Sequence, residues 1–374
     1  MTEPRPKLAV LVAFSGAGGV ERMVLNLLPA FDGAGVSVDL LAILRKPNPE
    51  ISQLQEPHLR VIDLGVRHTN LALAPLVRYL RAERPQALLV AKDRAIRTAI
   101  LARKLSGVNT RLVGRLGTHL SESLKGKPAP LRWLRTQPMR WLYAGVDAVV
   151  AVSRDVAEDT RRLTGLPASR IHVIHNPVIT PSLLPDSRQP VDHPWFNDRG
   201  SPVILGAGRL TRQKDFATLM RAFAWVKAQQ DCRLVILGEG NLRPALEQLA
   251  TDLGIAEAVS LPGFVRNPHA YMAKARLFVL SSRWEGSANV LTEALALGVP
   301  VVSTDCPGGS RELLEDGRYG PLVPTENPEA LGQAMLDTLS APLTADFLRQ
   351  AAEEYNVALS AQRYLEVLGL NRVV

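Results

Sequence analysis

The sequence predicts an α/β protein built of two Rossmann-like, doubly wound domains. The chain has 374 residues, more than one core ordinarily supports and enough for two domains of roughly 150 to 200 residues. Short β-branched runs alternate with longer amphipathic segments in both halves, as in parallel strands joined by crossover helices. Between the halves, residues 177–202 are rich in Pro, Asp, Ser and Asn, and this composition predicts an interdomain linker.

The elements of the first half follow from short apolar runs, which predict strands, and from stretches with helical spacing, which predict helices. The predicted strands are residues 8–14, 36–43, 87–90, 111–113, 148–152 and 171–174. The predicted helices are residues 20–30, 94–105 and 155–164. This alternation predicts one domain over residues 1–180.

The second half repeats the alternation after a linker that we place at residues 181–200. Its predicted strands are residues 203–206, 234–237, 259–261, 277–280, 299–303 and 322–323. Its predicted helices are residues 215–229, 243–253, 288–297 and 329–340. We therefore predict a second domain over residues 201–350, followed by a C-terminal helical segment over residues 351–374.

Composition places the chain among ordinary globular proteins, with 46% hydrophobic and 21% charged residues. The longest apolar runs are far shorter than the roughly 20 residues of a membrane-spanning helix. The N-terminus lacks the pattern of a signal peptide, so we expect a cytoplasmic protein. The only two cysteines, Cys232 and Cys306, argue against a disulfide framework or a cysteine metal site, and we expect both to be inert core thiols.

Charge is distributed unevenly along the chain. Residues 1–195 hold 27 Lys and Arg against 16 Asp and Glu, a net charge of +11, and the remainder holds 17 against 20, a net charge of −3. An anionic membrane surface or a nucleic acid would suit the basic half, and a solvated basic face is the plain alternative. We expect no nucleic-acid partner, because no recognisable nucleic-acid-binding module is present.

Residues 123–143 interleave basic and aromatic side chains. The basic residues are Lys125, Lys127, Arg132, Arg135 and Arg140, and Trp133 and Trp141 lie among them. This mixture suits an anionic bilayer interface, where the ring sits at headgroup level. Pro128, Pro130 and Pro138 predict that no single long helix forms here, so any insertion would be shallow or segmented. The alternative is a helix whose tryptophans pack inward.

The strongest functional signal is the segment 282–302, which follows a predicted strand. Gly286, Ser287 and Ala288 lead into a predicted helix, so free backbone N–H groups there can face an anion such as a diphosphate. Glu285 lies at the strand end and Glu293 about two helical turns further on. Both carboxylates can therefore border one elongated ligand and accept hydrogen bonds from its hydroxyl groups. The alternative is a capping Glu285 and a surface Glu293.

A second motif, residues 206–215, follows the first strand of the second half. Its Arg209 and Lys214 can reach the same phosphate oxygens, the arginine as a bidentate fork and the lysine as a mobile charge. Together they would stabilise the charge on a leaving nucleoside diphosphate. An exposed loop is the alternative for this motif, and Gly238 and Gly240, after the next strand, are also explained by a simple turn.

The first half contains a glycine loop, residues 16–19, between its first strand and first helix. Its glycines allow backbone to approach a ligand closely, and Asp39 lies about 20 positions further on, as in dinucleotide-binding sites. The glycine spacing nevertheless differs from that fingerprint, and a tight turn without a ligand is the alternative. His119 follows a short predicted strand, at the strand end where open α/β sheets bind ligands; a structural histidine is the alternative there.

Together these motifs resemble glycosyltransferase family 4, the retaining enzymes of the GT-B fold. The resemblance runs from about Val10 to Pro324. It is carried by Glu285 and Glu293 with seven residues between them, the Arg209 and Lys214 pair, the loop 16–22 and the junction 174–178. It implies two Rossmann-like domains facing across a cleft, with a nucleotide sugar bound mainly by the second domain and an acceptor mainly by the first. We also expect the C-terminal helix to pack back on the first domain.

The resemblance also implies a role for each matched residue. Glu285 would contact the transferred sugar, Glu293 the ribose, and His119 the sugar near the reacting centre. Arg209 and Lys214 would contact the diphosphate. The other expected donor-binding residues are Gly18, Gly19, Phe264, Val265, Gly286, Ser287, Ala288, Asn289 and Val290, with Phe264 and Val265 beside the base. The chain departs from the family at 287–289, where many members carry an aromatic residue and a proline.

The predicted function is therefore transfer of a sugar from a nucleoside diphosphate sugar, with UDP as the expected nucleotide. The acceptor class implied is a saccharide or a polyprenyl-diphosphate-linked glycan in cell-surface glycan assembly, which would place a peripheral enzyme at the inner face of the cytoplasmic membrane. No Asp-x-Asp motif or metal-ligand spacing occurs, so we expect neither metal nor cofactor. The alternatives are a sugar-nucleotide 2-epimerase of GT-B architecture and an NAD-dependent dehydrogenase.

Overall fold

The computed structural model divides the chain into two compact α/β units. It describes residues 5–14, 19–44, 51, 54–197 and 200–371. Unit 1 comprises residues 1–178 and 356–374, and unit 2 comprises residues 179–355. The range 181–200, predicted as a linker, lies within unit 2, where α8 (Leu183–Ser187) packs against α12 (Pro268–Lys274).

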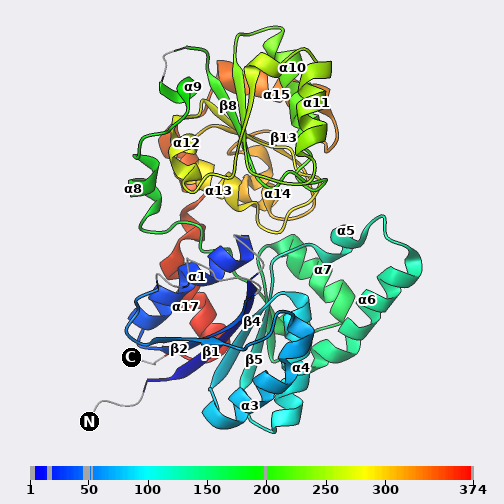
Figure 1. The fold of residues 1–374 in the computed structure, drawn as a ribbon, viewed down its shortest axis with the longest axis vertical. Helices are drawn as coiled ribbons and strands as arrows, with labels where there is room; N and C mark the ends of the chain where they lie inside the picture. Colours follow the sequence, from blue (N-terminus) through cyan, green and yellow to red (C-terminus); the bar gives the residue numbers. More distant parts are fainter. Residues whose placement is uncertain (1–4, 15–18, 45–50, 52–53, 198–199, 372–374) are drawn as a thin grey trace. The chain divides into compact units, whose positions relative to one another are not determined.

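Unit 1 is built on a seven-stranded parallel sheet in the order β3-β2-β1-β4-β5-β6-β7 (Figure 1). This is the Rossmann order, in which the chain reverses direction across the sheet beside β1. The strands are β1 (Lys7–Phe14), β2 (Ser37–Leu44), β3 (Leu59–Asp63), β4 (Ala87–Ala91), β5 (Arg111–Leu116), β6 (Ala148–Ala151) and β7 (Ile171–Val173). The helices are α1 (Gly19–Gly33), α3 (Leu73–Glu83), α4 (Asp93–Ser106), α5 (Leu120–Leu124), α6 (Ala129–Leu142), α7 (Arg154–Thr164) and α17 (Val357–Leu368), with 3₁₀ turns η1 (Thr69–Ala72), η2 (Tyr143–Gly145) and η3 (Ala168–Arg170).

Unit 2 contains a six-stranded parallel sheet in the order β10-β9-β8-β11-β12-β13. Its strands are β8 (Val203–Ala207), β9 (Arg233–Leu237), β10 (Val259–Gly263), β11 (Leu277–Leu280), β12 (Val301–Thr304) and β13 (Leu322–Val323). Besides α8 and α12, its helices are α9 (Pro194–Asn197), α10 (Phe216–Lys227), α11 (Arg243–Asp252), α13 (Asn289–Ala296), α14 (Ser310–Leu313), α15 (Pro328–Ser340) and α16 (Ala345–Gln350), with 3₁₀ turns η4 (Ala256–Ala258), η5 (Glu315–Gly317) and η6 (Glu353–Tyr355). Two Rossmann-like doubly wound units, as predicted, are confirmed.

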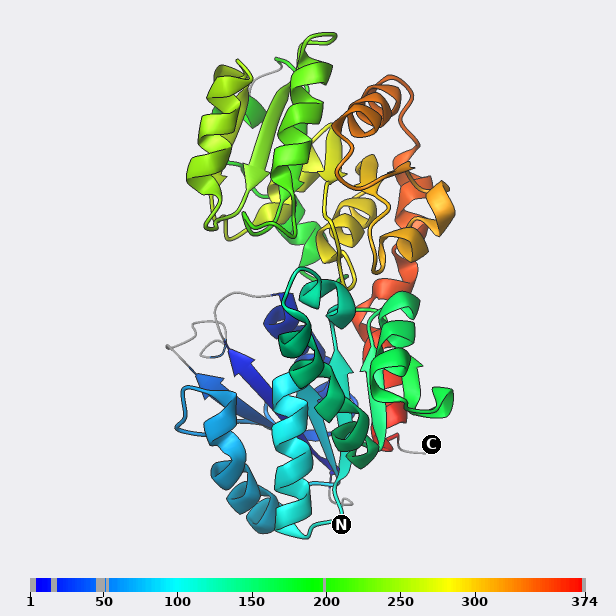
Figure 2. The same ribbon diagram turned by 90° about the vertical axis from the view of Figure 1, so that its right-hand side faces the viewer.

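Helices cover both faces of each sheet, so the central strands are buried on both sides (Figures 1 and 2). On one face of unit 1, α17 returns from the far end of the chain to pack beside α1. Tyr364 of α17 meets Phe31 of α1 edge to face, with ring centroids 6.5 Å apart. Its hydroxyl also accepts a hydrogen bond from Nε of the buried Arg115 on β5 (3.1 Å). The C-terminal helix is therefore part of the core of unit 1.

The predicted break in residues 123–143 is found at Pro128, because α5 ends at Leu124 and α6 begins at Ala129. No break follows at Pro138, since α6 runs without interruption over 14 residues, Ala129–Leu142. Pro130 lies in the first turn, where a missing N–H costs no helical hydrogen bond. Pro138 lies inside the helix and removes one such bond, a loss that contacts of α6 with α4 and α7 offset. Helix α6 therefore carries the three arginines and the two tryptophans of this segment, whereas Lys125 and Lys127 precede it.

Candidate functional site

The centre of the candidate site is the carboxylate of Glu285, in the loop between β11 and α13. This side chain is buried, and its Oε1 accepts hydrogen bonds from Lys214 Nζ (2.6 Å) and Ser282 Oγ (2.6 Å). The Glu285 amide donates to the Pro307 carbonyl (2.8 Å). A Cβ at Gly308 would lie 2.4 Å from the Glu285 carbonyl oxygen, so the next loop packs directly on Glu285. The carboxylate is consequently held in one position.

Lys214 lies in the loop after β8, 71 residues before Glu285. The two loops meet because β8 and β11 are neighbouring parallel strands. Two hydrogen bonds to backbone carbonyls tie them together: Ser281 Oγ donates to the Lys214 carbonyl (2.8 Å), and the Arg283 amide donates to the Gln213 carbonyl (2.8 Å). The sequence signals at 209–214 and 285 therefore form one structural unit, with an ammonium and a carboxylate in contact at its centre.

Arg209 is placed differently from Lys214, although both lie in the loop after β8. Its side chain is exposed, and we find no hydrogen bond or ion pair for it within the described residues. The structure therefore holds the Lys214 side chain in place but leaves the Arg209 side chain in solvent. That both contact one phosphate stays a prediction.

Glycine residues let two loops of unit 2, those after β8 and β9, approach each other. A Cβ at Gly238 would lie 1.9 Å from the Gly208 carbonyl oxygen, and one at Gly208 would lie 2.9 Å from Lys214 Cε. Both glycines have positive φ, +135° and +155°, which favours glycine. Gly238, which sequence alone also explains as a simple turn, therefore supports the backbone on which the stem of Lys214 rests.

The backbone between the two glutamates turns sharply into α13. Ala288 has φ +40° and ψ +48°, a left-handed conformation that a non-glycine residue rarely adopts. Gly286, Ser287 and Ala288 are buried, and Asn289 and Val290 are half-buried. The Leu291 amide donates to the Ala288 carbonyl (2.8 Å). The first amides of a helix are the kind of donors that a helix start offers to an anion.

Glu293 is buried on α13 beside a histidine that the sequence motifs did not include. His269 Nε2 lies 3.6 Å from Glu293 Oε1, and His269 Nδ1 lies 3.8 Å from Asp186 Oδ2. Nε2 has no hydrogen-bond partner in the structure, and both separations exceed normal hydrogen-bond length. His269 comes from α12, so the packing of α12 against α13 brings it to Glu293. Its sequence context, after Asn267-Pro268, signals only a helix start.

We expect Glu293→Gln to raise the KM for the donor about tenfold or more while lowering kcat much less. A charged acceptor contributes more to a hydrogen bond from a ribose hydroxyl than a neutral amide does. Initial rates over a range of donor concentrations measure both constants. A kcat that falls as far as kcat/KM would instead place Glu293 in the reacting centre.

The last donor-side prediction concerns the loop after β10. Gly263 ends this strand with φ +91°. The Phe264 side chain is exposed, and Val265 is half-buried. An exposed aromatic ring at the carboxyl end of a strand is suited to stacking on a base. The structure places Phe264 there but shows no contact that assigns it a ligand.

In unit 1, Gly18 lies outside the described residues, and Gly19 is the exposed first residue of α1. Two residues further, the buried Glu21 accepts a hydrogen bond from Lys92 Nζ (2.7 Å), which also donates to the Ala13 carbonyl (2.9 Å). Lys92 has φ +76°, an unfavourable conformation for lysine. This ion pair joins the ends of β1 and β4 and was not predicted from the sequence.

His119 is buried and caps α5, where its Nδ1 accepts a hydrogen bond from the Glu122 amide (3.4 Å). Its Nε2 lies 3.4 Å from Asp155, and its Nδ1 lies 3.4 Å from the buried Asp159. Burial alone would lower the pKa of His119, but the contact with Asp155 and the charges of Asp159 and Glu122 outweigh it and raise the pKa. The structure thus gives His119 a structural role, while its position after β5 is the one predicted.

The raised pKa of His119 predicts a stability difference that depends on pH. The folded state binds this proton more tightly than the unfolded state, so the contribution is complete below about pH 6.5 and is lost as the pH rises through the folded pKa. The protonated imidazole donates from both nitrogens, toward Asp155 and Asp159, and no longer accepts from the Glu122 amide. Asn in place of His119 can cap α5 at every pH but carries no charge. Thermal melts of the wild type and His119→Asn should therefore differ most at low pH and converge above neutrality. A gap that widens with rising pH would contradict the assignment.

The two cysteines and a pocket of unit 2 add no reactive group to the candidate site. Cys232 and Cys306 are buried, and burial raises the pKa of their thiols to about 11 and about 12. They are therefore protonated at neutral pH.

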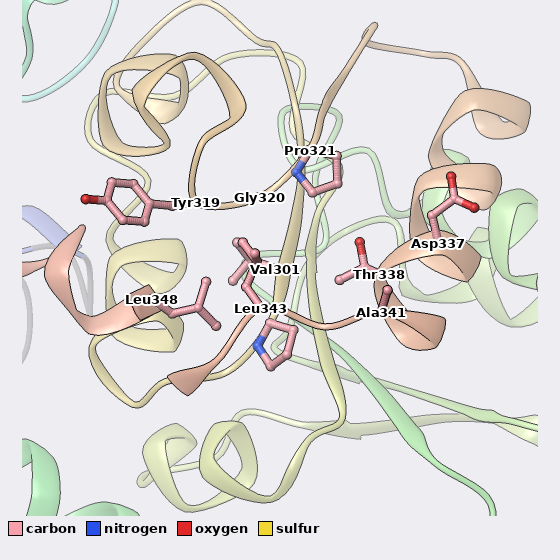
Figure 3. A pocket seen from close by; sticks show the side chains of 10 residues that line it. Val301, Tyr319, Gly320, Pro321, Asp337, Thr338, Ala341, Leu343 and Leu348 are labelled. Carbon is pink, nitrogen blue, oxygen red and sulfur yellow. The ribbon is translucent and has the colours of Figure 1, made fainter. Parts of the chain in front are cut away.

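A pocket of about 310 Å³ lies in unit 2 beside Val301, Leu343 and Leu348 (Figure 3). Val301 begins β12, whereas Glu285 follows the end of β11, so this pocket is separate from the candidate site.

Within the ranges given above, no three His, Cys, Asp or Glu side chains are grouped so that they could hold a metal ion. None of the helices there is both long enough and apolar enough to span a bilayer.

Comparison with known proteins covers both units. Residues 17–180 match the family model described as Glycosyltransferase Family 4, and residues 201–341 match the one described as Glycosyl transferases group 1. A Campylobacter jejuni N-acetylgalactosamine-N,N'-diacetylbacillosaminyl-diphospho-undecaprenol 4-alpha-N-acetylgalactosaminyltransferase is 30% identical over 356 residues, 92% of each chain. The lipopolysaccharide core biosynthesis glycosyltransferase LpsE of Rhizobium meliloti is 29% identical over 86% of each chain.

Solved structures show the same fold. The crystal structure of Anabaena HepE in complex with UDP and glucose superposes with a TM-score of 0.78 at 19% identity, covering 98% of this chain and 100% of that chain. The apo form of the lipopolysaccharide outer core galactosyltransferase WaaB gives a TM-score of 0.73 at 20% identity over 97% and 99% of the chains. At this level of identity the likeness concerns the fold, and the predicted GT-B class is confirmed.

Proposed function

We propose that this chain, which belongs to glycosyltransferase family 4, transfers a sugar from a UDP-sugar to a lipid-linked saccharide. The transferred sugar keeps its configuration at the anomeric carbon. The observation that carries the proposal is the buried contact of Glu285 with Lys214 and Ser282. It joins a carboxylate suited to sugar hydroxyls with a cation suited to a diphosphate.

In the proposed reaction, the bond between the anomeric carbon and the diphosphate oxygen breaks, and a bond from the acceptor hydroxyl oxygen to that carbon forms on the same face. The acceptor proton passes to the leaving phosphate oxygen. Lys214 and the amides that precede Leu291 would stabilise the negative charge of the leaving group, so no metal is required. Glu285 would orient the sugar, and its hydrogen bonds keep Lys214 in place before the donor arrives.

UDP as the nucleotide is supported by the fold shared with HepE, whose structure holds UDP and glucose. A hexose or N-acetylhexosamine as the sugar, and a polyprenyl-diphosphate-linked glycan as the acceptor, are supported by the name of the Campylobacter relative. Such an acceptor would place the enzyme at the inner face of the cytoplasmic membrane.

Helix α6 supports peripheral attachment to an anionic membrane through residues 123–143. Within α6, Met139 alone is buried. Trp133, Leu134 and Trp141 are 64%, 62% and 82% exposed, so the tryptophans do not pack inward. Exposed apolar side chains gathered on one helix mark an interaction surface, and the neighbouring arginines favour anionic headgroups.

We expect Leu134→Gln to weaken binding to phosphatidylglycerol vesicles about fivefold, since it removes roughly 1 kcal/mol of apolar burial. Leu105→Gln is the matched control, because Leu105 is similarly exposed (56%) but lies on α4. Co-sedimentation at constant salt measures both. Equal binding by both variants and the wild type would remove the support for attachment through α6.

The experiment that tests the proposed reaction is a transfer assay with a panel of UDP-sugars and a short polyprenyl-diphosphate saccharide. The proposal predicts a glycosylated lipid whose new linkage keeps the donor's anomeric configuration, together with one UDP per transfer and full activity in EDTA. UDP release with an unsaturated sugar and without acceptor would identify the 2-epimerase instead.

The acidic residue that the NAD-dependent dehydrogenase alternative requires, Asp39, is engaged by other side chains in the structure. Asp39 is buried, and it accepts hydrogen bonds from Arg60 Nε (2.9 Å) and Tyr79 OH (2.6 Å). Burial would raise the pKa of Asp39, but these hydrogen bonds lower it. A carboxylate engaged in this way is unavailable to a ribose hydroxyl.

A further inference from the structure

Unit 1 contains a basic pocket apart from the residues considered so far. It has a volume of about 380 Å³ and lies where η1, α3 and α4 meet. Its lining combines two arginines, two uncharged polar residues and two leucines: Arg94, Arg97, Asn70, Thr98, Leu73 and Leu101. The lining contains no carboxylate.

The two arginines differ in how they are held. Arg97 is fixed by Asp93, with Nε donating to Oδ1 (3.0 Å) and an ion pair from the terminal nitrogen to Oδ2 (2.9 Å). Asp93 in turn accepts a hydrogen bond from Tyr143 OH (2.9 Å). Arg94 is exposed; its carbonyl accepts a hydrogen bond from Thr98 Oγ1 (3.2 Å), but its guanidinium makes no hydrogen bond or ion pair within the described ranges. The pocket therefore has one preorganised guanidinium and one whose charge is uncompensated.

The pocket is joined directly to α6. The terminal nitrogen of Arg97 that pairs with Asp93, Nη2, also donates to the Arg135 carbonyl on that helix (2.7 Å). An amphiphile lying against the exposed side chains of α6 would thus have its polar end next to Arg97. Leu73 and Leu101 supply apolar surface beside the arginines. A lipid can bury hydrocarbon against this surface, whereas a soluble polyanion cannot.

We propose that this pocket binds a phosphate group carried by a lipid. The guanidinium fork of Arg94 can match two phosphate oxygens. Arg97, whose Nε and Nη2 are held by Asp93 and the Arg135 carbonyl, adds its other terminal nitrogen, and Asn70 and Thr98 add uncharged polar groups. Two sources share this chemistry, the headgroup of an anionic phospholipid and the diphosphate of a polyprenyl-linked acceptor. The second source rests on the proposed function, whereas the first does not.

The test compares Arg94→Gln with Lys104→Gln. Both changes remove one positive charge from an exposed position on α4, and Lys104 is not part of the pocket. Ten residues separate them, about 15 Å along the helix, which exceeds the Debye length of about 8 Å at 0.15 M salt. Co-sedimentation at that salt uses three kinds of vesicle: phosphatidylcholine alone, with phosphatidylglycerol, and with a small fraction of undecaprenyl diphosphate.

The proposal predicts about tenfold weaker binding by Arg94→Gln, the loss expected for a charge-assisted contact, with Lys104→Gln close to the wild type. Loss on both anionic vesicles identifies a phospholipid headgroup, and loss on undecaprenyl diphosphate vesicles alone identifies the acceptor diphosphate. Equal binding by the two variants on every vesicle overturns the proposal. Donor binding is read separately as the melting shift with UDP, so failure of the proposed function is distinguishable from failure of the pocket.

Discussion

Replacing Glu285 by Gln is expected to lower kcat/KM about a thousandfold, the loss typical of removing one preorganised electrostatic group from a reacting centre. Gln keeps the shape of the side chain and can still accept the hydrogen bond from Ser282. Its amide group cannot neutralise Lys214, whose ammonium lies 2.6 Å from the carboxylate and is 15% exposed. Lys214 would turn away, and the position from which it meets a diphosphate would be lost.

The control for this variant is Glu247→Gln. Glu247 also pairs with a basic side chain, Arg243, at 3.1 Å, but it is exposed on α11. Surface pairs of this kind contribute little, so activity and melting temperature should stay close to the wild type. Steady-state rates for both variants decide the matter: activity of Glu285→Gln within a few-fold of the wild type would remove Glu285 from the reacting centre.

The largest effect on stability is expected from Gly238→Ala. The new methyl group would lie 1.9 Å from the Gly208 carbonyl oxygen, and the residue would need a φ of +135°. The cost is about 3 kcal/mol or more, because two backbones must separate and the conformation is strained. For a domain of this size the melting temperature should fall by about 6–12 °C. Displacement of Gly208 would also release the stem of Lys214, so activity should fall with stability.

The variant Gly254→Ala separates the cost of the strained backbone conformation from the cost of the steric clash. Gly254 has φ +68°, but a Cβ there meets no atom within 4 Å. This variant should lose only the conformational part, about 1 kcal/mol. Calorimetric melts of the two variants give the comparison, and a Gly238→Ala protein that melts no lower than Gly254→Ala would show that the two loops do not pack as described.

The sequence predicted those elements whose apolar residues are buried on both sides. Strands such as β1 and β11 are continuous apolar runs and were found. Strand β3, Leu59–Asp63, has only half-buried or exposed residues, so it leaves no apolar run to detect. Helix α3 was also missed, although Leu76, Tyr79 and Leu80 form its buried stripe. The break expected at Pro138 is absent from α6, because propensity rules ignore the neighbours that stabilise a helix containing proline.

The candidate site was predicted as separate motifs, and what joins them is topology. Glu285 and Lys214 meet because β8 and β11 are adjacent in the sheet, which no local pattern records. Ser282 precedes Glu285 by three residues and could have been found from that spacing. His269 could not, because its contact with Glu293 depends on how α12 packs against α13. The roles of all the predicted site residues in binding a donor, from Glu285 and Lys214 to His119 and Phe264, stay predictions.

The proposed function requires unit 2 to bind a nucleoside diphosphate through Lys214, the start of α13 and Glu293. Calorimetric titration of UDP into the wild type, Glu293→Gln and Glu247→Gln measures this binding. We expect saturable binding of one UDP, at least tenfold weaker in Glu293→Gln and unchanged in Glu247→Gln. The absence of UDP binding to the wild type, or equal affinity in all three proteins, would contradict this expectation.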